Sequence, residues 1–484
     1  MNTQNLPFIR LIKTPVNNYA YDVNTNSFIE LSDDTYKYLE DMLYYGNIDI
    51  SASQNVRHSV AQLRNEGFLS SKRPMKIEHT QIPFLEKLLA NSLNQMTLQI
   101  TQECNFRCAY CSYSGNAIRR HREHSSKKMS VETALKCVDF FVNHSTNRDR
   151  VALAFYGGEP LLEFELIKIV VDYAEKKFFG KDLSFQVTTN GSLLTPEVTP
   201  YLSEHNFNVT ISLDGTSEIH NRSRKFASTG GGTFDSIKNN IDAIKACHPS
   251  LYEWIGFNVV IDPRYPCNDL HIYFNETDTF KDAQVQSGII DDAFSLEKVV
   301  ASEDYIHENN YHDFKVFLSL INRYPQVKVS RFAKNGVLRN YFQVEENLFW
   351  STKLSDSMAP SGPCIPGALR LFVNAIGDFY PCERVSETSE AMKIGNIYDG
   401  FDLDNAKNLI NIGQLTEEDC KNCWAIRHCI ICAKQCDNNG FLCADLKRAQ
   451  CEFTKETVEN NLKDYLFLKD FSITINAIKK EATI

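Results

Sequence analysis

The chain has 484 residues, 43% of them hydrophobic, enough for two or three domains with apolar cores. A formal net charge of −10 argues against a nucleic-acid partner, which would favour a basic face. No stretch approaches the roughly 20 apolar residues that cross a bilayer, and the start of the chain lacks a signal-peptide pattern. We therefore expect a cytoplasmic protein with no membrane partner.

The first 73 residues predict a small separate domain. Two strand-like runs flank residues 24–26 and predict a β-hairpin. Ser32 can cap a helix, a second helix ends near Gly67, and Phe68-Leu69 starts a short strand. This order resembles the winged-helix peptide-recognition element of peptide-modifying enzymes. The resemblance implies that a leader peptide binds as an added strand at the hairpin edge, and a capping subdomain without a ligand is the alternative.

Residues 74–94 are interpreted as a linker with a short helix, and strands alternate with helices from residue 95 to residue 302. The strand-like runs cover residues 97–101, 151–155, 183–188, 208–213, 256–261 and 283–290. Ser130, Thr195-Pro196 and Thr233 open amphipathic helices between them. This repetition predicts an α/β fold with a parallel sheet, whose functional groups gather at the carboxyl ends of the strands.

Three cysteines, Cys104, Cys108 and Cys111, follow the first of these strands. Three thiolates fill three corners of a cubane iron–sulfur cluster and leave the fourth iron open to an outside ligand. This spacing, on a loop that leaves a strand, resembles the radical S-adenosylmethionine (SAM) superfamily. The resemblance implies a partial (β/α)6 TIM-like barrel, in which the open iron binds SAM and one electron splits SAM into methionine and a 5′-deoxyadenosyl radical. Half of a zinc site is the alternative.

Polar groups also end the strands that follow. The run Gly157-Gly158-Glu159-Pro160 comes after the second strand, and the resemblance implies that it holds the SAM amino group. Its two glycines would let the backbone approach a ligand closely, and Glu159 would supply an acceptor. The other SAM contacts that the resemblance implies are Tyr110, Asn190, Ser212, Asp214 and Arg224. For Arg224, expected to hold the SAM carboxylate, a surface ion pair is the alternative.

Residues 303–350 are helical and aromatic, and we interpret them as a bridge to a cysteine-rich region at 351–484. Eight cysteines lie between 382 and 451, a crowding that indicates metal in a reducing cytosol. The pattern resembles the SPASM extension, which carries two auxiliary cubane clusters. The resemblance implies an outer cluster on Cys420, Cys423, Cys429 and Cys451 and an inner cluster on Cys364 and Cys382 with Cys432, Cys436 or both.

The inner cluster departs from the family pattern, because Ala433 stands where the family has a ligand. With both Cys432 and Cys436 the cluster is closed; with one of them it keeps an iron open for a substrate thiolate. A zinc ribbon is the alternative for the whole region, since Cys-x2-Cys recurs in it.

Glu383 is the candidate catalytic residue outside the barrel. Anaerobic sulfatase-maturing relatives place an aspartate base after the cysteine that matches Cys382, and here that position holds Glu383, followed by Arg384. The neighbouring arginine favours the ionised carboxylate, which weakens the sulfatase-maturase interpretation without removing it.

The sequence thus predicts a radical SAM maturase that installs thioether crosslinks in a ribosomally made precursor peptide, as sactipeptide and ranthipeptide maturases do. The implied cofactors are SAM, one SAM-binding [4Fe-4S] cluster and two auxiliary [4Fe-4S] clusters. The implied partners are the precursor peptide, bound through its leader, and an external one-electron donor of the flavodoxin or ferredoxin type. The alternatives are carbon–carbon crosslinking, epimerisation or formylglycine formation, an iron–sulfur electron-transfer protein, and a zinc-stapled peptide-binding module.

Overall fold

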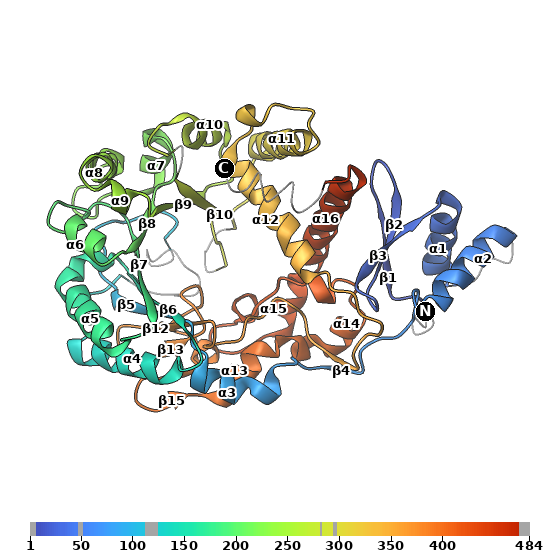
Figure 1. Ribbon diagram of the computed structural model, residues 1–484, viewed down its shortest axis with the longest axis horizontal. Coiled ribbons are helices and arrows are strands. Elements are labelled where there is room, and N and C mark those ends of the chain that lie inside the picture. The colour runs from blue at the N-terminus through green and yellow to red at the C-terminus, as the bar shows by residue number, and fades with distance from the viewer. Residues whose placement is uncertain (1–5, 47–51, 112–123, 281–282, 294–297, 474–484) are drawn as a thin grey trace.

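The computed structural model describes residues 6–46, 52–111, 124–280, 283–293 and 298–473 (Figure 1). The N-terminal part holds β1 (Ile9–Lys13), β2 (Asn18–Asp22), β3 (Ser27–Leu31), α1 (Asp33–Tyr45) and α2 (Gln54–Asn65). The predicted hairpin is β2–β3, and Ser32 caps α1 by accepting the N–H of Thr35. Residues 68–69 form no strand, because Leu69 has a φ of 59° and its N–H donates to the Asp22 carboxylate at 2.7 Å.

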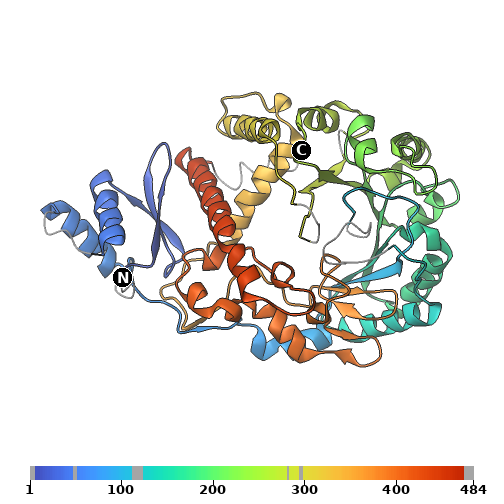
Figure 2. The same ribbon diagram turned by 180° about the vertical axis from the view of Figure 1, so that it is seen from behind.

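The β1–β2–β3 sheet is covered on both faces. Ile9, Ala20 and Ile29 pack toward α1 and α2. On the other face Tyr21 joins a core shared with α12 (Arg331–Asn347) and α16 (Cys451–Asp470), and the ring of Phe28 stacks on Tyr465. Figures 1 and 2 both show this sheet beside α16. The N-terminal residues therefore share a core with the far end of the chain.

Residues 74–94 are packed, unlike a free linker. They contain β4 (Lys76–Ile77), η2 (Ile82–Phe84) and α3 (Leu85–Asn91). β4 pairs with β11 (Ser357–Met358), and Leu85, Leu89 and Leu93 are buried in the central core.

The barrel region contains β5 (Gln95–Thr101), α4 (Val131–His144), β6 (Arg150–Gly157), η3 (Pro160–Glu163), α5 (Phe164–Lys177), β7 (Asp182–Thr189), α6 (Thr199–Glu204), β8 (Asn208–Ser212), α7 (Ser217–Ser223), α8 (Phe234–Cys247), α9 (Pro249–Tyr252), β9 (Ile255–Ile261), α10 (Asn268–Glu276) and β10 (Gln284–Ile289). β5 to β10 run parallel, so the predicted α/β fold is confirmed. α4, α5, α6 and α8 lie outside the sheet (Figure 1). The helix expected at Thr195-Pro196 begins at Thr199.

Two strands missed in the sequence extend this sheet beyond β5. β12 (Arg370–Val373) pairs parallel with β5, and β13 (Phe379–Tyr380) pairs antiparallel with β12. In the described part of the chain the strand order is β10-β9-β8-β7-β6-β5-β12-β13. The cysteine-rich region therefore begins as part of the barrel sheet.

The rest of the chain is mainly short elements around the remaining cysteines. The helical bridge holds α11 (Glu303–Leu320), η4 (Gln326–Lys328) and α12. The C-terminal region adds η5 (Glu390–Met392), β14 (Gly395–Asn396), β15 (Gly400–Phe401), α13 (Leu403–Ile410), η6 (Ile412–Thr416), α14 (Glu417–Lys421), η7 (Ile426–His428), η8 (Ala433–Cys436), α15 (Ala444–Ala449) and α16. Among the described residues, none of the helices combines the length and apolarity needed to span a bilayer.

Candidate functional site

The loop that carries Cys104, Cys108 and Cys111 leaves the carboxyl end of β5 and is fixed on both sides. The buried ring of Phe106 meets Phe226 edge-on at 5.2 Å. The backbone N–H of Ala109 donates to the Ser223 carbonyl at 2.9 Å. All three cysteines are partly exposed and line a cavity of about 1950 Å³.

Gly157 and Gly158 pack against the start of this cysteine loop. A Cβ on Gly158 would lie 2.1 Å from the Glu103 carbonyl oxygen, and a Cβ on Gly157 would lie 2.2 Å from that of Thr101. The N–H of Gly158 donates to the Thr101 carbonyl at 2.8 Å. Both glycines line the cavity, but the close approach that requires them is to the backbone of the cysteine loop.

Glu159 lies beneath the cavity and does not line it. Its buried carboxylate accepts hydrogen bonds from the Thr189 hydroxyl at 2.7 Å, the Asn190 N–H at 2.7 Å and the Leu161 N–H at 3.1 Å. Burial raises the pKa of Glu159 to about 7, against the lowering effect of these three bonds. Pro160 is buried as well. The side chain expected to face a ligand instead joins the turn after β6 to the end of β7.

Asp214 and Arg224 form a buried ion pair next to the cysteine loop. The Arg224 side chain donates to the Asp214 carboxylate at 2.8 Å and 3.2 Å, and the Tyr110 hydroxyl donates to the same carboxylate at 2.5 Å. Arg224 is only 6% exposed, so the alternative of a surface ion pair is wrong. Tyr110 and Arg224 line the cavity, while Asp214 lies behind them and orients both.

Asn190 and Ser212, at the ends of β7 and β8, also line the cavity. The Asn190 amide donates to the Asn105 side chain at 2.7 Å, and its oxygen accepts from the N–H of Ser192 at 2.9 Å. Asn190 therefore links the end of β7 to the cysteine loop.

The C-terminal cysteines fall into two groups. In the inner group, burial raises the pKa of Cys382 to about 11, and the nearby Cys364 and Cys432 add to the rise. In the outer group, burial raises the pKa of Cys429 to about 12, with contributions from Cys423 and Cys420. Cys451 likewise raises the pKa of Cys423. These neighbours are the ones that the SPASM resemblance implied.

Cys436 is fully buried at the boundary between the two groups. Burial raises its pKa to about 12. Of the neighbouring charges, Lys447 has the largest effect and lowers this pKa, while Cys432, Cys429 and Cys451, in decreasing order of effect, raise it. Three of these four residues belong to the outer group or contact it.

A buried lysine, not singled out in the sequence, lies inside the outer group. Lys447 is 1% exposed, and its ammonium donates to the Cys420 sulfur at 3.1 Å and to the Thr416 hydroxyl at 2.6 Å. The Cys-x-x-Cys spacing gave no signal for it, since Lys447 lies on α15, 27 residues away.

Glu383 lines the cavity, but its partner differs from the expected one. Arg370, on β12, donates to both carboxylate oxygens at 2.8 Å and 3.1 Å. The Arg384 guanidinium is mostly exposed and lies 3.9 Å from the carboxylate. Arg370 therefore holds the Glu383 carboxylate in place.

The cysteine arrangement fits cubane clusters. Within the described ranges, no three His, Cys, Asp or Glu side chains stand close enough to share one metal ion. A cubane needs a wider arrangement, because each thiolate binds a different iron. Cys104, Cys108 and Cys111 lie on one loop and all line one cavity, so they offer three thiolates to such a cluster.

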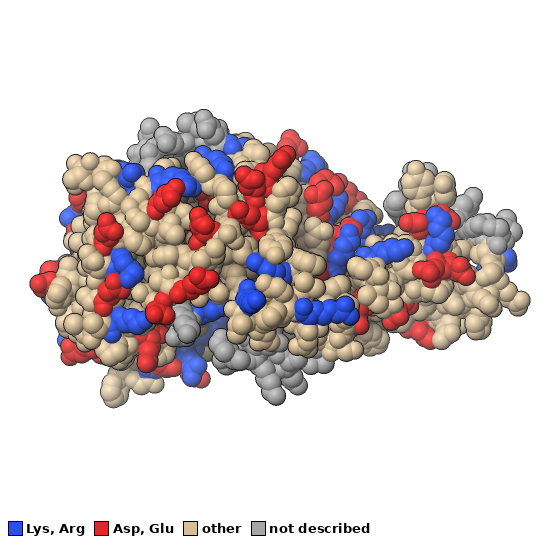
Figure 3. All heavy atoms as spheres, turned by 90° about the horizontal axis from the view of Figure 1, so that it is seen from above, with Lys and Arg blue, Asp and Glu red and all other residues tan. Residues whose placement is uncertain are grey.

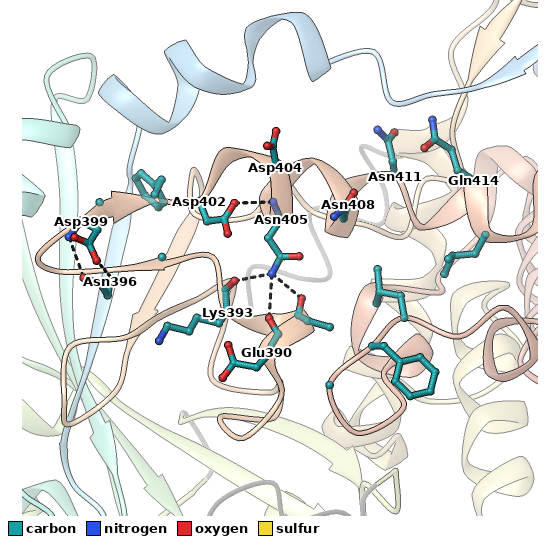
Figure 4. A pocket seen from close by; sticks show the side chains of 18 residues that line it. Glu390, Lys393, Asn396, Asp399, Asp402, Asp404, Asn405, Asn408, Asn411 and Gln414 are labelled. Carbon is teal, nitrogen blue, oxygen red and sulfur yellow. Dashed lines mark hydrogen bonds between the residues drawn. The ribbon is translucent and has the colours of Figure 1, made fainter.

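A second pocket, of about 970 Å³, lies over α13 and the β14–β15 hairpin (Figure 4). The Asn405 amide donates to the carbonyls of Glu390, Ala391 and Lys393, and Asp402 caps α13. These polar groups hold the loops together. No predicted site residue lines this pocket.

Comparison with known proteins agrees with this geometry. The Radical SAM superfamily model matches residues 98–262. The radical SAM cyclopropyl synthase TigE of Paramaledivibacter caminithermalis is 23% identical over 350 residues, which are 70% of this chain and 67% of TigE. A serine-type anaerobic sulfatase-maturating enzyme of Bacteroides thetaiotaomicron is 25% identical over 371 residues, 73% of this chain and 84% of that enzyme.

Among solved structures, native anSMEcpe with bound AdoMet shares the fold, with a TM-score of 0.54 and 22% identity over 76% of this chain and 98% of that one. The family match spans β5 to β9 and includes the cysteine loop. Residues 98–262 therefore match the radical SAM superfamily, the chain has homology to SPASM-type maturases, and the protein is a radical SAM enzyme that uses SAM and a [4Fe-4S] cluster.

Proposed function

We propose that this enzyme matures a ribosomally made peptide by joining a cysteine sulfur to an unactivated carbon of the same peptide. The observation that carries the proposal is the cavity that the cysteine loop lines. Its volume of about 1950 Å³ exceeds the roughly 300–1,000 Å³ of typical small-ligand pockets. The cavity is large enough for a peptide segment beside SAM.

One end of this cavity would serve formation of the radical, and the other would serve attachment of the peptide's sulfur. Cys104, Cys108 and Cys111 would hold the cluster that binds SAM, which supplies the 5′-deoxyadenosyl radical when bound. Glu383 and Arg384, which follow Cys382 in the chain, line the same cavity. A bound peptide would therefore reach from the cysteine loop toward the inner cysteine group.

We further propose that the inner site keeps an open iron for the peptide cysteine. Cys364 and Cys432 both raise the pKa of Cys382, and Cys432 raises that of Cys364, so these three thiols are neighbours. With these three as ligands, one of the four irons of a cubane has no protein thiolate. The proposal leaves Cys436 out of this set; its buried sulfur contacts the Cys432 carbonyl at 3.6 Å and also lies near Lys447, Cys429 and Cys451 of the outer group. A metal-bound thiol loses its proton and is held in one orientation, as attack on a carbon radical requires.

The N-terminal sheet and an outside electron donor complete the proposal. β3 is an edge strand in the β1–β2–β3 sheet and could accept a leader peptide as a further strand. A flavodoxin or ferredoxin would supply the electron for SAM cleavage.

A second candidate, formylglycine formation, is favoured by the position of Glu383. This carboxylate lines the cavity directly after Cys382, and the relatives include a serine-type sulfatase-maturating enzyme. This candidate ranks second, because one guanidinium nitrogen of Arg370 already donates to both carboxylate oxygens that would have to accept the proton.

The test is anaerobic incubation of the reconstituted enzyme with SAM, a reductant and a cysteine-containing precursor from a neighbouring reading frame. A thioether removes two hydrogen atoms from the peptide and one thiol from the set that iodoacetamide alkylates. Loss of two hydrogen atoms with every thiol still alkylated would indicate a carbon–carbon crosslink or a serine-derived formylglycine. Unchanged peptide mass with deuterium uptake from solvent would indicate epimerisation.

A further inference from the structure

We propose that the peptide segment to be modified binds in extended form, as an added strand on the outer edge of β10. This inference rests on the proposed function and states how the cavity holds its substrate. The substrate class is a segment without proline that the enzyme recognises mainly through backbone N–H and C=O groups.

β10 ends the large sheet on one side. In the described part of the chain, β9 is the strand that pairs with β10, and none pairs with its other edge. The opposite end of the sheet is closed, because β13 has only two residues, both buried, and the Phe379 carbonyl accepts from the N–H of Ile394 at 2.8 Å. Of the two end strands, β10 is the one that lies along the cavity.

The cavity contacts β10 on both of its faces. From β8 it takes alternate residues, Asn208, Thr210 and Ser212, which lie on one face of the sheet. From β10 it takes all six consecutive residues, Gln284–Ile289, which belong to both faces, and none of the six is buried. A cavity that reaches both faces of an end strand also passes over the edge between them.

The bonds between β10 and β9 show which backbone groups face outward. In a parallel pair the N–H and C=O of one residue point to the same neighbouring strand, and successive residues alternate in direction. The register is uninterrupted, and the N–H of Ile290 donates to the Ile261 carbonyl at 3.0 Å, so the even-numbered residues of β10 point toward β9. The groups that point away from the sheet are those of Val285, Ser287 and Ile289.

The sequence of β10 does not protect this edge from pairing. Exposed edge strands usually carry a lysine, a proline or a β-bulge that prevents another strand from adding. The six residues Gln-Val-Gln-Ser-Gly-Ile include no charge and no proline, and their register with β9 has no bulge. The outer face in Figure 3 instead shows many acidic and basic side chains interspersed. An uncharged edge inside a cavity suits recognition by backbone hydrogen bonds.

The two ends of β10 fix where an added strand would lie. At the start, Arg331 of α12 donates to the Ala283 carbonyl at 3.2 Å, and Figures 1 and 2 show β10 between β9 and α12. Beyond the carboxyl end, Asp291 lines the cavity and forms an ion pair with Lys434, two residues after Cys432 in the inner group. The cysteine loop leaves β5 at this same end of the parallel sheet. A peptide along β10 would therefore extend toward both cysteine groups.

Fluorescence anisotropy with the full-length, cluster-loaded enzyme and saturating SAM tests the inference. The probe is fluorescein-labelled Thr-Val-Thr-Cys-Thr-Val-Thr, with one backbone amide N-methylated at a time. Methylation removes a hydrogen-bond donor, so binding should weaken about tenfold at one set of alternate residues and by less than about twofold at the other set. No effect at any residue, or the same effect at every residue, would overturn the inference.

Photo-crosslinking locates the bound probe. With photo-leucine in place of one Val of the peptide, crosslinks mapped by mass spectrometry should fall within residues 283–293. Crosslinks confined to β3 would overturn the inference, because they would place the peptide at the edge proposed for the leader.

Two variants at one position separate the backbone from the side chain. Ser287→Pro removes an outward N–H, whereas Ser287→Ala keeps it, so Ser287→Ala should bind the probe about tenfold more tightly than Ser287→Pro. Equal affinity of the two folded variants would overturn the inference. The methylation scan uses the unchanged enzyme and decides the question even where Ser287→Pro fails to fold.

The outcomes for this inference and for the proposed function are distinct. Alternation in the methylation scan with every peptide thiol still alkylated after turnover would support the added strand and overturn the thioether. Loss of a thiol without any alternation would overturn the added strand and leave the proposed function standing.

Discussion

The two cysteine-bearing regions of this enzyme are built differently. Cys104, Cys108 and Cys111 lie on one loop at a strand end, partly exposed to a large cavity. The C-terminal cysteines come from many short elements, and two of them, Cys420 and Cys436, are buried. The first region therefore opens as a whole onto one cavity, whereas the cysteines of the second range from the buried Cys420 and Cys436 to the exposed Cys364.

The supporting contacts differ in the same way. The cysteine loop is held from below by backbone contacts with Gly157 and Gly158 and by polar contacts with Asn190. The outer group contains a buried ammonium, that of Lys447, which bonds directly to a cysteine sulfur. Backbone support fixes the position of the loop, whereas a positive charge next to a ligand sulfur changes the reduction potential of a cluster.

The largest expected effect comes from removing the proposed cluster ligands of the first region. The triple change Cys104→Ala, Cys108→Ala and Cys111→Ala should abolish 5′-deoxyadenosine formation, because the cluster that binds SAM loses all of its thiolates. Iron analysis should fall by about four irons per chain, and the C-terminal clusters should remain. Deoxyadenosine formation that survives the triple change would contradict the assignment of this loop.

Gly158→Ala tests whether backbone support positions the cysteine loop. The new Cβ would lie 2.1 Å from the Glu103 carbonyl oxygen, so the loop must move. We expect SAM cleavage to fall by about 100-fold, as for a misplacement of about 1 Å. Gly256→Ala is the control, since its Cβ would meet nothing closer than 3.6 Å. Equal activity of the two variants would show that the loop does not depend on this contact.

The buried Glu159 gives a pH-dependent effect. Its pKa is about 7 in the folded enzyme and 4.5 when unperturbed, so the folded state binds this proton more tightly. The contribution of Glu159 to the free energy of unfolding should therefore be largest below about pH 4.5 and fall by about 3 kcal/mol as the pH rises to about 7. Glu159→Gln should remove this part of the pH dependence of the melting temperature.

Glu165→Gln, on the exposed surface of α5, is the control and should leave the pH dependence as it is. If Glu159→Gln weakens SAM binding and leaves the pH profile of stability unchanged, Glu159 contacts the ligand and does not act as a buried support.

The smallest expected effect concerns Lys447. Lys447→Met keeps the length of the side chain but removes the ammonium next to the Cys420 sulfur. The midpoint potential of one C-terminal cluster should fall by about 50 mV, because the reduced cluster loses a nearby positive charge and a hydrogen bond. Redox titration followed by electron paramagnetic resonance measures this shift. Lys463→Met, on an ion pair with Glu459, should leave every potential unchanged.

Features that depend on neighbours in the sequence could be predicted. The strands from β5 to β10, the helix capped by Ser32 and the helix capped by Ser130 follow from periodicity and capping residues within a few positions. The close approach at Gly157-Gly158 was expected too, but its partner was not, because glycine indicates contact without identifying what is contacted.

Features that depend on distant residues could not be predicted. The pairing of β12 with β5, the bond between Arg370 and Glu383 and the burial of Lys447 among cysteines all bring together elements from separate parts of the chain. Lysine, in particular, is almost never buried unless it has a partner, so nothing local marks Lys447 as an interior residue.

The pairing of β5 with β12 has a consequence for how the protein is made. The N–H of Ala375 bonds to the Gln99 side chain across 276 residues of chain. At about 5–20 residues per second, a ribosome needs on the order of tens of seconds to supply β12 after β5 has emerged. During that time β5 has an unpaired edge, and the cysteine loop at its end is attached to an unfinished sheet. The sheet that supports the cysteine loop can therefore be completed only after most of the chain has been synthesised.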